Sequence, residues 1–293
     1  MAEIIFQSRM DAKRFFNHLL KYVSIPIDEK TILLIEDRHI VKLLDGSFSS
    51  EQFNQVKLAF YHFITTIKRD EWFRDIIKNQ YYYQEEEEQE QIIEIIYSIL
   101  DGQREDLEVF LKEANKATSF IEEAVDSILQ DHVSFSFDSL LKFRLRPYRQ
   151  ILEGYVELAI DEYKMEQEYQ MFIQMLRDFL VNREPKMQTL HVLLDEEITF
   201  YNEHLIEIKR AELTRMIDRK LLVNHPVYVD SVSIAPLLSI APVSIFLYTN
   251  NPDEPLVRTI KNIFEERVTI KSYTALRGLE KWTIDQDSSE NHA

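Results

Sequence analysis

Residues 147 to 185 read PYRQILEGYVELAIDEYKMEQEYQMFIQMLRDFLVNREP, and this stretch decides the class of fold. Pro147 suits the first turn of a helix, and Pro185 disfavours helical geometry at Glu184. Between the two prolines, apolar side chains recur with the period of one helix face. They are Ile151, Leu152, Tyr155, Val156, Ala159, Ile160, Tyr163, Tyr169, Phe172, Ile173, Leu176 and Leu180. The pattern predicts one unbroken helix of about 36 residues.

Helical patterns also fill the chain upstream of this stretch. Ser49 or Ser50 can cap a helix, and Gln52 lies near the capping-box position. Glycine supplies only four of the 293 residues, which argues against glycine-rich phosphate loops and turn-dense all-β folds. We expect about five helices across residues 49–185. They are separated at three places, Asp101-Gly102, 130–139 and Arg146-Pro147.

The two ends of the chain have strand-like patterns. Residues 1–48 predict a β-α-β-β unit, residues 186–281 predict a second small α/β unit, and residues 282–293 predict a flexible tail. The sequence therefore predicts an α+β, predominantly helical protein, with a long-helix middle region over 49–185 between the two α/β units. Whether the strands of those units share one sheet stays open. The elements expected in the second unit are strands at 187–194, 197–202, 203–208, 243–248 and 267–270 and helices at 211–222, 229–238 and 254–266.

A run of 22 residues without a charge, SVSIAPLLSIAPVSIFLYTNNP at 231–252, stands out in a chain of which 29% of residues are charged. Its two interior prolines would each break a spanning helix, so we expect no membrane insertion. We expect instead a buried helix over 229–238, capped by Asp230 or Ser231. A central strand over 243–248, buried on both faces, should follow it.

The end of this run offers a first candidate site. Thr249, Asn250 and Asn251 follow the expected strand at the carboxyl end, where α/β sheets bind ligands. The same residue types also form ordinary turns and helix caps. Asp253 and Glu254 disfavour a phosphate there. We keep these three residues as candidate ligand-binding residues, although a turn is the favoured interpretation.

A second candidate site lies in KFRLRPYR, at the start of the long helix. Its four cations are Lys142, Arg144, Arg146 and Arg149. In a chain of net charge −17 they are a local exception, and guanidinium groups can bind carboxylate or phosphate. Internal pairing is the favoured alternative, because Arg149 and Glu153 lie four residues apart on one helix.

No recognised catalytic chemistry is visible. The chain has no cysteine and no GxSxG, P-loop, GxGxxG or HExxH motif. Carboxylates four apart in 153–161 share a helix face, but the Glu-x-x-His pairs of a di-metal site are missing, so we expect no metal and no cofactor. The glutamate-rich stretch 81–91 is typical of a solvated helix or linker. His191 and His204 could face each other, but a structural role is favoured for both.

The charge and the first residues bear on localisation and partners. The net charge of −17 opposes general binding to nucleic acid or anionic lipid. The start, MAEIIFQSRMDAKRFF, lacks the apolar run of a signal peptide, which predicts a cytoplasmic protein.

Three segments carry a resemblance to a known family. They are FRLRPYRQILEGYVELAIDEYKMEQEYQMFIQMLRDFL at 143–180, TLHVLLDEEITFYN at 189–202 and LLSIAPVSIFLYT at 237–249. Together they resemble the YtxC family of sporulation proteins from endospore-forming bacteria, over about the second half of the chain. The resemblance implies a cytoplasmic bacterial protein associated with spore formation. It brings no activity, cofactor or catalytic residue with it.

The sequence thus favours a non-enzymatic interaction or regulatory protein whose helical middle and acidic surface bind a protein partner in sporulation. The alternative is a small-ligand-binding or enzymatic α/β site near 142–149 or 249–251. A nucleic-acid regulator is less supported, because the basic cluster is its sole foothold.

Overall fold

The computed structural model describes residues 2–23, 31–44, 49–104, 106, 108–130, 134–181, 183–218, 230 and 232–276. The chain divides into two compact units, Met1–Met165 and Glu166–Ala293. The prediction of a predominantly helical α+β protein is confirmed. The described strands form two separate four-stranded sheets, so the two β-rich ends of the chain do not share one sheet.

The first unit begins with the β-α-β-β order that the sequence predicts. Its sheet has the strand order β2-β3-β1-β4, in which β1 is antiparallel to β3 and parallel to β4. The strand β4 was not predicted, because two residues are too short for a strand pattern. The elements are β1 (Ala2–Ile5), α1 (Arg9–Tyr22), β2 (Ile32–Ile35), β3 (Ile40–Leu43) and β4 (Phe135–Ser136).

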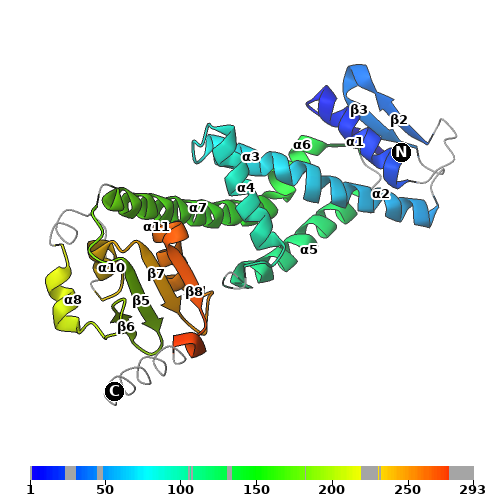
Figure 1. Cartoon of the computed structure of the whole chain (residues 1–293). Helices are drawn as coiled ribbons and strands as arrows, with labels where there is room; N and C mark the ends of the chain where they lie inside the picture. The colour runs from blue at the N-terminus through cyan, green and yellow to red at the C-terminus, as the bar shows by residue number, and fades with distance from the viewer. Residues whose placement is uncertain are drawn as a thin grey trace, which may run out of the picture. The chain divides into compact units, whose positions relative to one another are not determined.

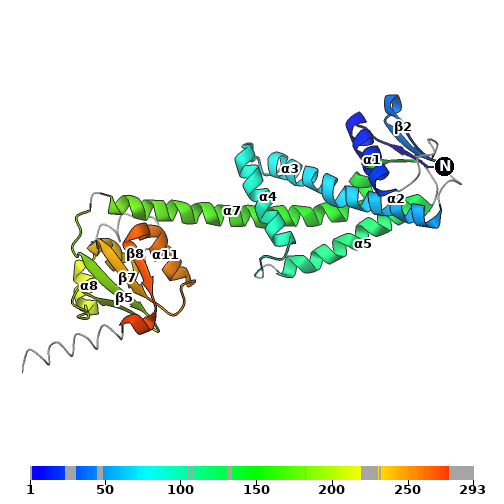
Figure 2. The ribbon, with the colours of Figure 1, turned by 45° about the vertical axis from the view of Figure 1, so that its right-hand side comes forward.

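Helices make up the rest of the first unit (Figure 1 and Figure 2). Ser49 caps the first of them, and the predicted capping box with Gln52 is confirmed. The turn at Asp101-Gly102 is also confirmed, and Gly102 has a φ of 69°, which glycine adopts without steric cost. A further interruption at 80–85 was not predicted. The helices are α2 (Ser50–His62), a π-helical segment (Phe63–Lys68), α3 (Arg69–Asn79), α4 (Glu86–Leu100), α5 (Glu108–Gln130), α6 (Phe137–Ser139), a second π-helical segment (Leu140–Arg144) and α7 (Arg146–Leu180).

The predicted long helix is α7, which is 35 residues long and has Pro147 in its first turn. Its residues up to Met165 belong to the first unit and those from Glu166 to the second. The predicted apolar stripe is buried in both cores: Leu152, Val156 and Ile160 in the first, Ile173, Leu176 and Leu180 in the second.

Five phenylalanines join the sheet to the helices in the first unit. Phe137 of α6 lies against Phe6 at 4.8 Å between ring centroids and against Phe15 at 5.8 Å. Phe15 in turn contacts Phe60 at 4.5 Å and Phe63 at 5.0 Å. All five are buried. Because each buried aromatic ring contributes about 1.5–3 kcal/mol, this cluster is a main source of the unit's stability.

The second unit is a four-stranded sheet of order β6-β5-β7-β8. β5, β7 and β8 are parallel, and β6 forms an antiparallel hairpin with β5. The predicted central strand is confirmed as β7. The elements of the second unit are β5 (Thr189–Leu194), β6 (Ile198–Tyr201), α8 (Arg210–Met216), α10 (Ile234–Ile240), β7 (Ser244–Tyr248), α11 (Pro255–Phe264) and β8 (Val268–Lys271).

Three expectations for this unit need correction, and the first two concern residues 203–222. The strand expected at 203–208 reduces to one bridge between Tyr201 and Glu207, because Asn202 accepts hydrogen bonds from two following backbone N–H groups and turns the chain. The expected helix at 211–222 ends at Met216. Of the predicted segments, 219–229 and the tail 282–293 lie outside the described residues.

The buried helix expected at 229–238 begins later, at Ile234. Asp230 accepts hydrogen bonds from the backbone N–H groups of Val232 (3.1 Å) and Ser233 (2.9 Å), so it caps the turn before the helix. The prediction that it caps the helix itself is wrong, because the N-cap residue is Ser233. The helix ends at Ile240, because Ala241 has a φ of 49° and Pro242 cannot donate a helical hydrogen bond.

The helices of the second unit cover one face of its sheet. Leu190, Val192, Ile245 and Leu247 project into the core with α8, α10, α11 and the end of α7. The opposite face carries the side chains of His191, Phe246 and Tyr248, which alternate with these residues along the strands. The predicted burial of β7 on both faces is confirmed on the helical face. On the other face Tyr248 is buried as well, whereas Ser244 and Phe246 are only half-buried. No helix within the described ranges has both the length and the apolar character of a membrane span.

Candidate functional site

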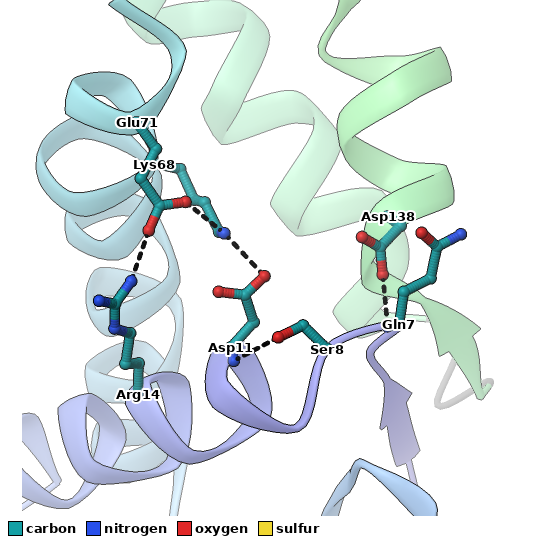
Figure 3. A network of polar contacts seen from close by, with 7 residues as sticks. All are labelled: Gln7, Ser8, Asp11, Arg14, Lys68, Glu71 and Asp138. Carbon is teal, nitrogen blue, oxygen red and sulfur yellow. Dashed lines mark hydrogen bonds and ion pairs between the residues drawn. The ribbon is translucent and has the colours of Figure 1, made fainter. Parts of the chain in front are cut away.

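The strand β4 and the short helix α6 position the basic cluster of the first unit. Ile4 and Ile5 of β1 pair with Phe135 and Ser136 of β4. Asp138 of α6 then accepts a hydrogen bond of 2.8 Å from the backbone N–H of Gln7 (Figure 3). The chain therefore enters the π-helical segment from a fixed position beside β1.

An ion-pair network holds α1 against the first π-helical segment. Lys68 is 6% exposed, and its Nζ lies 2.9 Å from Asp11 and 2.6 Å from Glu71 (Figure 3). Arg14 completes the network at 2.7 Å from Glu71. Two cations and two carboxylates balance, which explains how a lysine is tolerated in so buried a position. Because its charges are matched, the network is a structural clamp between α1 and α3 rather than a ligand site.

The second π-helical segment presents its polar side to solvent. Leu140 and Leu145 are buried on either side of it, and a hydrogen bond of 3.1 Å runs from Leu145 N to Leu140 O. Phe143, between them, is 70% exposed, and Lys142 Nζ lies 5.7 Å from the centre of its ring. We call the exposed residues Lys142, Phe143, Arg144 and Arg146 the Phe143 surface.

The four predicted cations have different partners. Arg149 lies 3.0 Å from Asp75 and 3.6 Å from Glu153, so it makes the i,i+4 ion pair that its spacing predicts. Arg144 donates a hydrogen bond to the hydroxyl of Ser127. Among the described residues, neither it nor Lys142 nor Arg146 makes an ion pair with a carboxylate. The structure thus separates Arg149 from the other three cations, which keep their charge at the surface.

The predicted residues Thr249, Asn250 and Asn251 lie in the other unit, after β7. Thr249 Oγ1 accepts a hydrogen bond of 3.0 Å from Asn251 N, and Asn251 Oδ1 accepts one of 3.3 Å from Asp253 N. Thr249 is buried, and Asn250 is exposed. These hydrogen bonds form the turn that leads into α11, so the Thr249 hydroxyl and the Asn251 Oδ1 are engaged within the loop itself.

The carboxylates of the 153–161 helix face have partners of their own. Glu157 accepts a hydrogen bond of 2.8 Å from the hydroxyl of Tyr81, and burial together with this carboxylate raises the pKa of Tyr81 to about 12. Glu162, next to that face, lies 2.8 Å from Arg104. In the part of the chain that the structure describes, no three His, Asp or Glu side chains are grouped as a metal site. These acids instead join α7 to the preceding segments.

The two histidines singled out by the sequence have different partners within the described residues. His191 is 7% exposed, shares a 2.9 Å hydrogen bond with the Tyr248 hydroxyl and stacks on Phe246. His204 is exposed beside Glu203. Burial, and secondarily the charge of Lys271, lowers the pKa of His191. Its imidazole is therefore neutral at pH 7, in the structural role that the sequence favoured.

One feature of the Phe143 surface could not be predicted from the sequence, namely the exposure of Phe143 itself. An aromatic residue between two cations reads equally well as core, and only the π-helical geometry of 140–144 turns it outward. The cations alone were visible in the sequence.

Comparisons with known proteins identify one family. The family model described as the YtxC-like family matches residues 54–269. The protein named "Uncharacterized protein YtxC" of Bacillus subtilis (strain 168) is 36% identical over 270 residues, covering 92% of this chain and 93% of that protein. No solved structure matches the chain.

Proposed function

We propose that this chain, which belongs to the YtxC-like family, is a non-enzymatic interaction protein that binds an acidic segment of a protein partner on the Phe143 surface. One observation carries the proposal. A phenylalanine that is 70% exposed stands among three surface cations without carboxylate partners among the described residues, in a chain of net charge −17.

The physical argument combines apolar area and charge. Covering an exposed phenylalanine ring contributes about 1.5–3 kcal/mol, which is enough to make Phe143 an anchor of an interface. Lys142 and Arg146 would then face carboxylates of the partner and select its charge. The N-terminus of α7 begins at Arg146, and the partial positive charge of a helix N-terminus adds to the same field.

An acidic protein segment suits this surface better than a nucleic acid does. Nucleic-acid binding draws its affinity from several phosphate contacts along an extended basic surface, and three cations provide few. The charge of −17 on the whole chain also repels a long polyanion. A short acidic segment contacts the local cluster and avoids most of that repulsion.

The setting belongs to the same proposal. The family resemblance supports a cytoplasmic role during sporulation, and the partner is then expected among proteins made in sporulating cells. The absence of any recognised catalytic motif in the sequence supports the non-enzymatic character.

A photo-crosslinking amino acid at position 143 tests the proposal in sporulating cells. We expect a crosslink to an acidic segment of one protein, and the purified partner should bind the wild-type chain. Phe143→Ala should weaken this binding about tenfold, and the double charge reversal Lys142→Glu/Arg146→Glu should weaken it further.

Matched controls are available in the same unit. Leu58→Ala removes another exposed apolar side chain, and Lys78→Glu reverses another exposed cation. Both should leave the affinity unchanged. Crosslinks to nucleic acid, crosslinks to neutral or basic segments, or an affinity insensitive to the double charge reversal would each overturn the proposal.

A further inference from the structure

A concave surface lies in the second unit, beside the terminal strand of the sheet. It is a cleft of about 930 Å³ between β6, α8 and the start of α10. In Figure 1, α8 lies beyond β6 at that end of the sheet. The volume is within the range of ligand-binding clefts. None of the residues of the Phe143 surface belongs to it.

One wall of the cleft is an open strand edge. β6 is the terminal strand, and its ladder partner is β5. Ile208 N donates a hydrogen bond of 2.8 Å to Phe200 O, which shows that the peptide groups of Phe200 point away from β5. Because peptide groups alternate along a strand, those of Ile198 point the same way. The segment 206–208 covers the edge after Phe200 and leaves the part at Ile198 without a strand partner in the described chain.

The other wall carries two arginines. Arg210 and Arg215 of α8 line the cleft, both are exposed, and neither makes an ion pair within the described ranges. The floor is apolar and is formed by Phe200, Leu213 and Pro236, which are buried. A ligand that fits must therefore offer backbone hydrogen-bonding groups, an apolar side chain and a negative charge.

The charge is not uniform along the cleft. Glu196 and Glu197, in the hairpin turn before β6, also line the cleft, and so does Glu207. These carboxylates would repel a ligand that is acidic along its whole length. The ligand chemistry that fits is one acidic group near α8 within an otherwise uncharged extended chain.

We infer that an extended peptide segment with a single acidic side chain adds to the outer edge of β6, with its carboxylate at Arg210 and Arg215. Strand addition satisfies the peptide groups at Ile198 and lets alternate side chains of the guest enter the apolar floor. A second copy of this chain, pairing through its own β6, is the competing occupant. The second copy is less favoured, because symmetric pairing through β6 would bring two clefts with the same charges next to each other.

The experiment uses the full chain and a pooled set of capped pentapeptides, X-Glu-X-Thr-X, in which X is Val, Ile or Leu. We expect saturable binding and slowed amide hydrogen exchange at Ile198 and Phe200. The counterpart peptides X-Lys-X-Thr-X, and peptides with N-methylated backbone, should not slow this exchange. Arg210→Glu/Arg215→Glu should weaken binding of the glutamate peptides by about fivefold or more.

Two variants complete the design. Ile198→Pro removes an edge N–H at a position where a terminal strand tolerates proline, so it should abolish binding while the sheet stays folded. Arg258→Glu reverses an exposed cation on α11 and should have no effect. Absence of binding, or equal binding of the N-methylated peptides, would overturn the inference. Exchange at Ile198 that slows with protein concentration alone would assign the edge to a second copy instead. Loss of the Phe143 surface should not alter any of these results.

Discussion

The two sheets of the molecule have the same number of strands and different constructions. In the first unit, β1 lies between β3 and a two-residue strand from the far end of the unit, so Ile4 pairs with both Val41 and Phe135. In the second, the sheet order is β6-β5-β7-β8: β5 and β6 form a hairpin, α8 and α10 lie in the chain between β6 and β7, and α11 lies between β7 and β8. The first sheet is completed by the pairing of β1 with β4, which lie far apart in the chain. The strands of the second sheet pair with strands that are closer in the chain.

This difference extends to the surfaces that the sheets support. The Phe143 surface exists because the pairing of β4 with β1 holds β4 and α6 beside β1. No local sequence pattern predicts this pairing. The cleft at β6 exists because a hairpin strand remains at the end of a locally built sheet. We therefore expect substitutions in the long-range packing of the first unit to lower its stability strongly. Substitutions on the sheet face opposite the helices of the second unit should lower the stability of that unit less.

The largest effect is expected from Phe137→Ala. Its ring is fully buried among Phe6, Phe15 and Phe63, so truncation leaves a cavity and should lower the free energy of unfolding of the first unit by about 3–5 kcal/mol. Phe143→Ala is the matched control on the same segment and should change stability by less than about 0.5 kcal/mol. Chemical denaturation followed by hydrogen exchange in each unit measures both. Equal losses for the two variants would contradict the placement of α6.

The next effect is expected from Lys68→Ala, which removes the central cation of the clamp between α1 and α3. Asp11 and Glu71 would keep their charges without the shared partner, and we expect a loss of about 3 kcal/mol in the first unit. Lys57→Ala breaks the 2.6 Å ion pair with Asp126 at a more exposed position and should cost less than about 1 kcal/mol. Equal losses of stability in the two variants would show that the Lys68 ion pairs are not buried, contrary to the 6% exposure of this residue.

The contrast between local patterns and long-range contacts also explains which elements could be predicted from the sequence. The 35-residue helix α7, the capping box at Ser49 and the central strand β7 all follow from local periodicity or local hydrogen bonds. The strand β4 could not be predicted, because two residues carry no periodicity and its partner β1 is remote in the chain. The turn at Asn202 was missed for a different reason, since its side chain caps a reversal inside a run that reads as strand.

The candidate site shows the same division. Charge is visible in a sequence, so the cations at 142–149 could be found, and the spacing of Arg149 and Glu153 correctly indicated their ion pair. Exposure is a property of the tertiary structure. The outward position of Phe143 and the open edge at Ile198 therefore appear only when the π-helical segment and the order of the strands are known.

A smaller effect is expected from Tyr248→Phe, on the face of the second sheet opposite its helices. The variant keeps the ring and removes the hydroxyl that shares a 2.9 Å hydrogen bond with His191. Because the imidazole is buried, the loss should be about 1 kcal/mol, confined to the second unit. Thermal unfolding of the variant and of His191→Phe/Tyr248→Phe checks this, since the double variant leaves no unpaired group and should recover part of the loss. A full loss in the double variant would mean that packing, rather than the hydrogen bond, matters at this position.

The smallest effect is expected from mild acid, and it compares one buried histidine in each unit. His18 of α1 is 8% exposed, its Nε2 has no hydrogen-bond partner among the described residues, and it stacks on His62 of α2 at 5.2 Å. Burial first, then the charges of His62 and Lys21, lower its pKa, and the pKa of His191 is lowered in the same direction. The unfolded chain, with histidine pKa values of about 6.5, therefore takes up protons before the folded chain does.

It follows that both units should keep their full stability above about pH 6.5 and lose part of it as the pH falls from there toward the folded pKa values. His18→Phe should flatten this dependence in the first unit alone, and His191→Phe in the second alone. Hydrogen exchange of each unit at about pH 7 and about pH 5 separates the two, after correction for the intrinsic exchange rates. An unchanged pH dependence of the first unit in His18→Phe would show that its orphan imidazole nitrogen is reached by water. The two histidines would then differ in hydration as well as in hydrogen bonding.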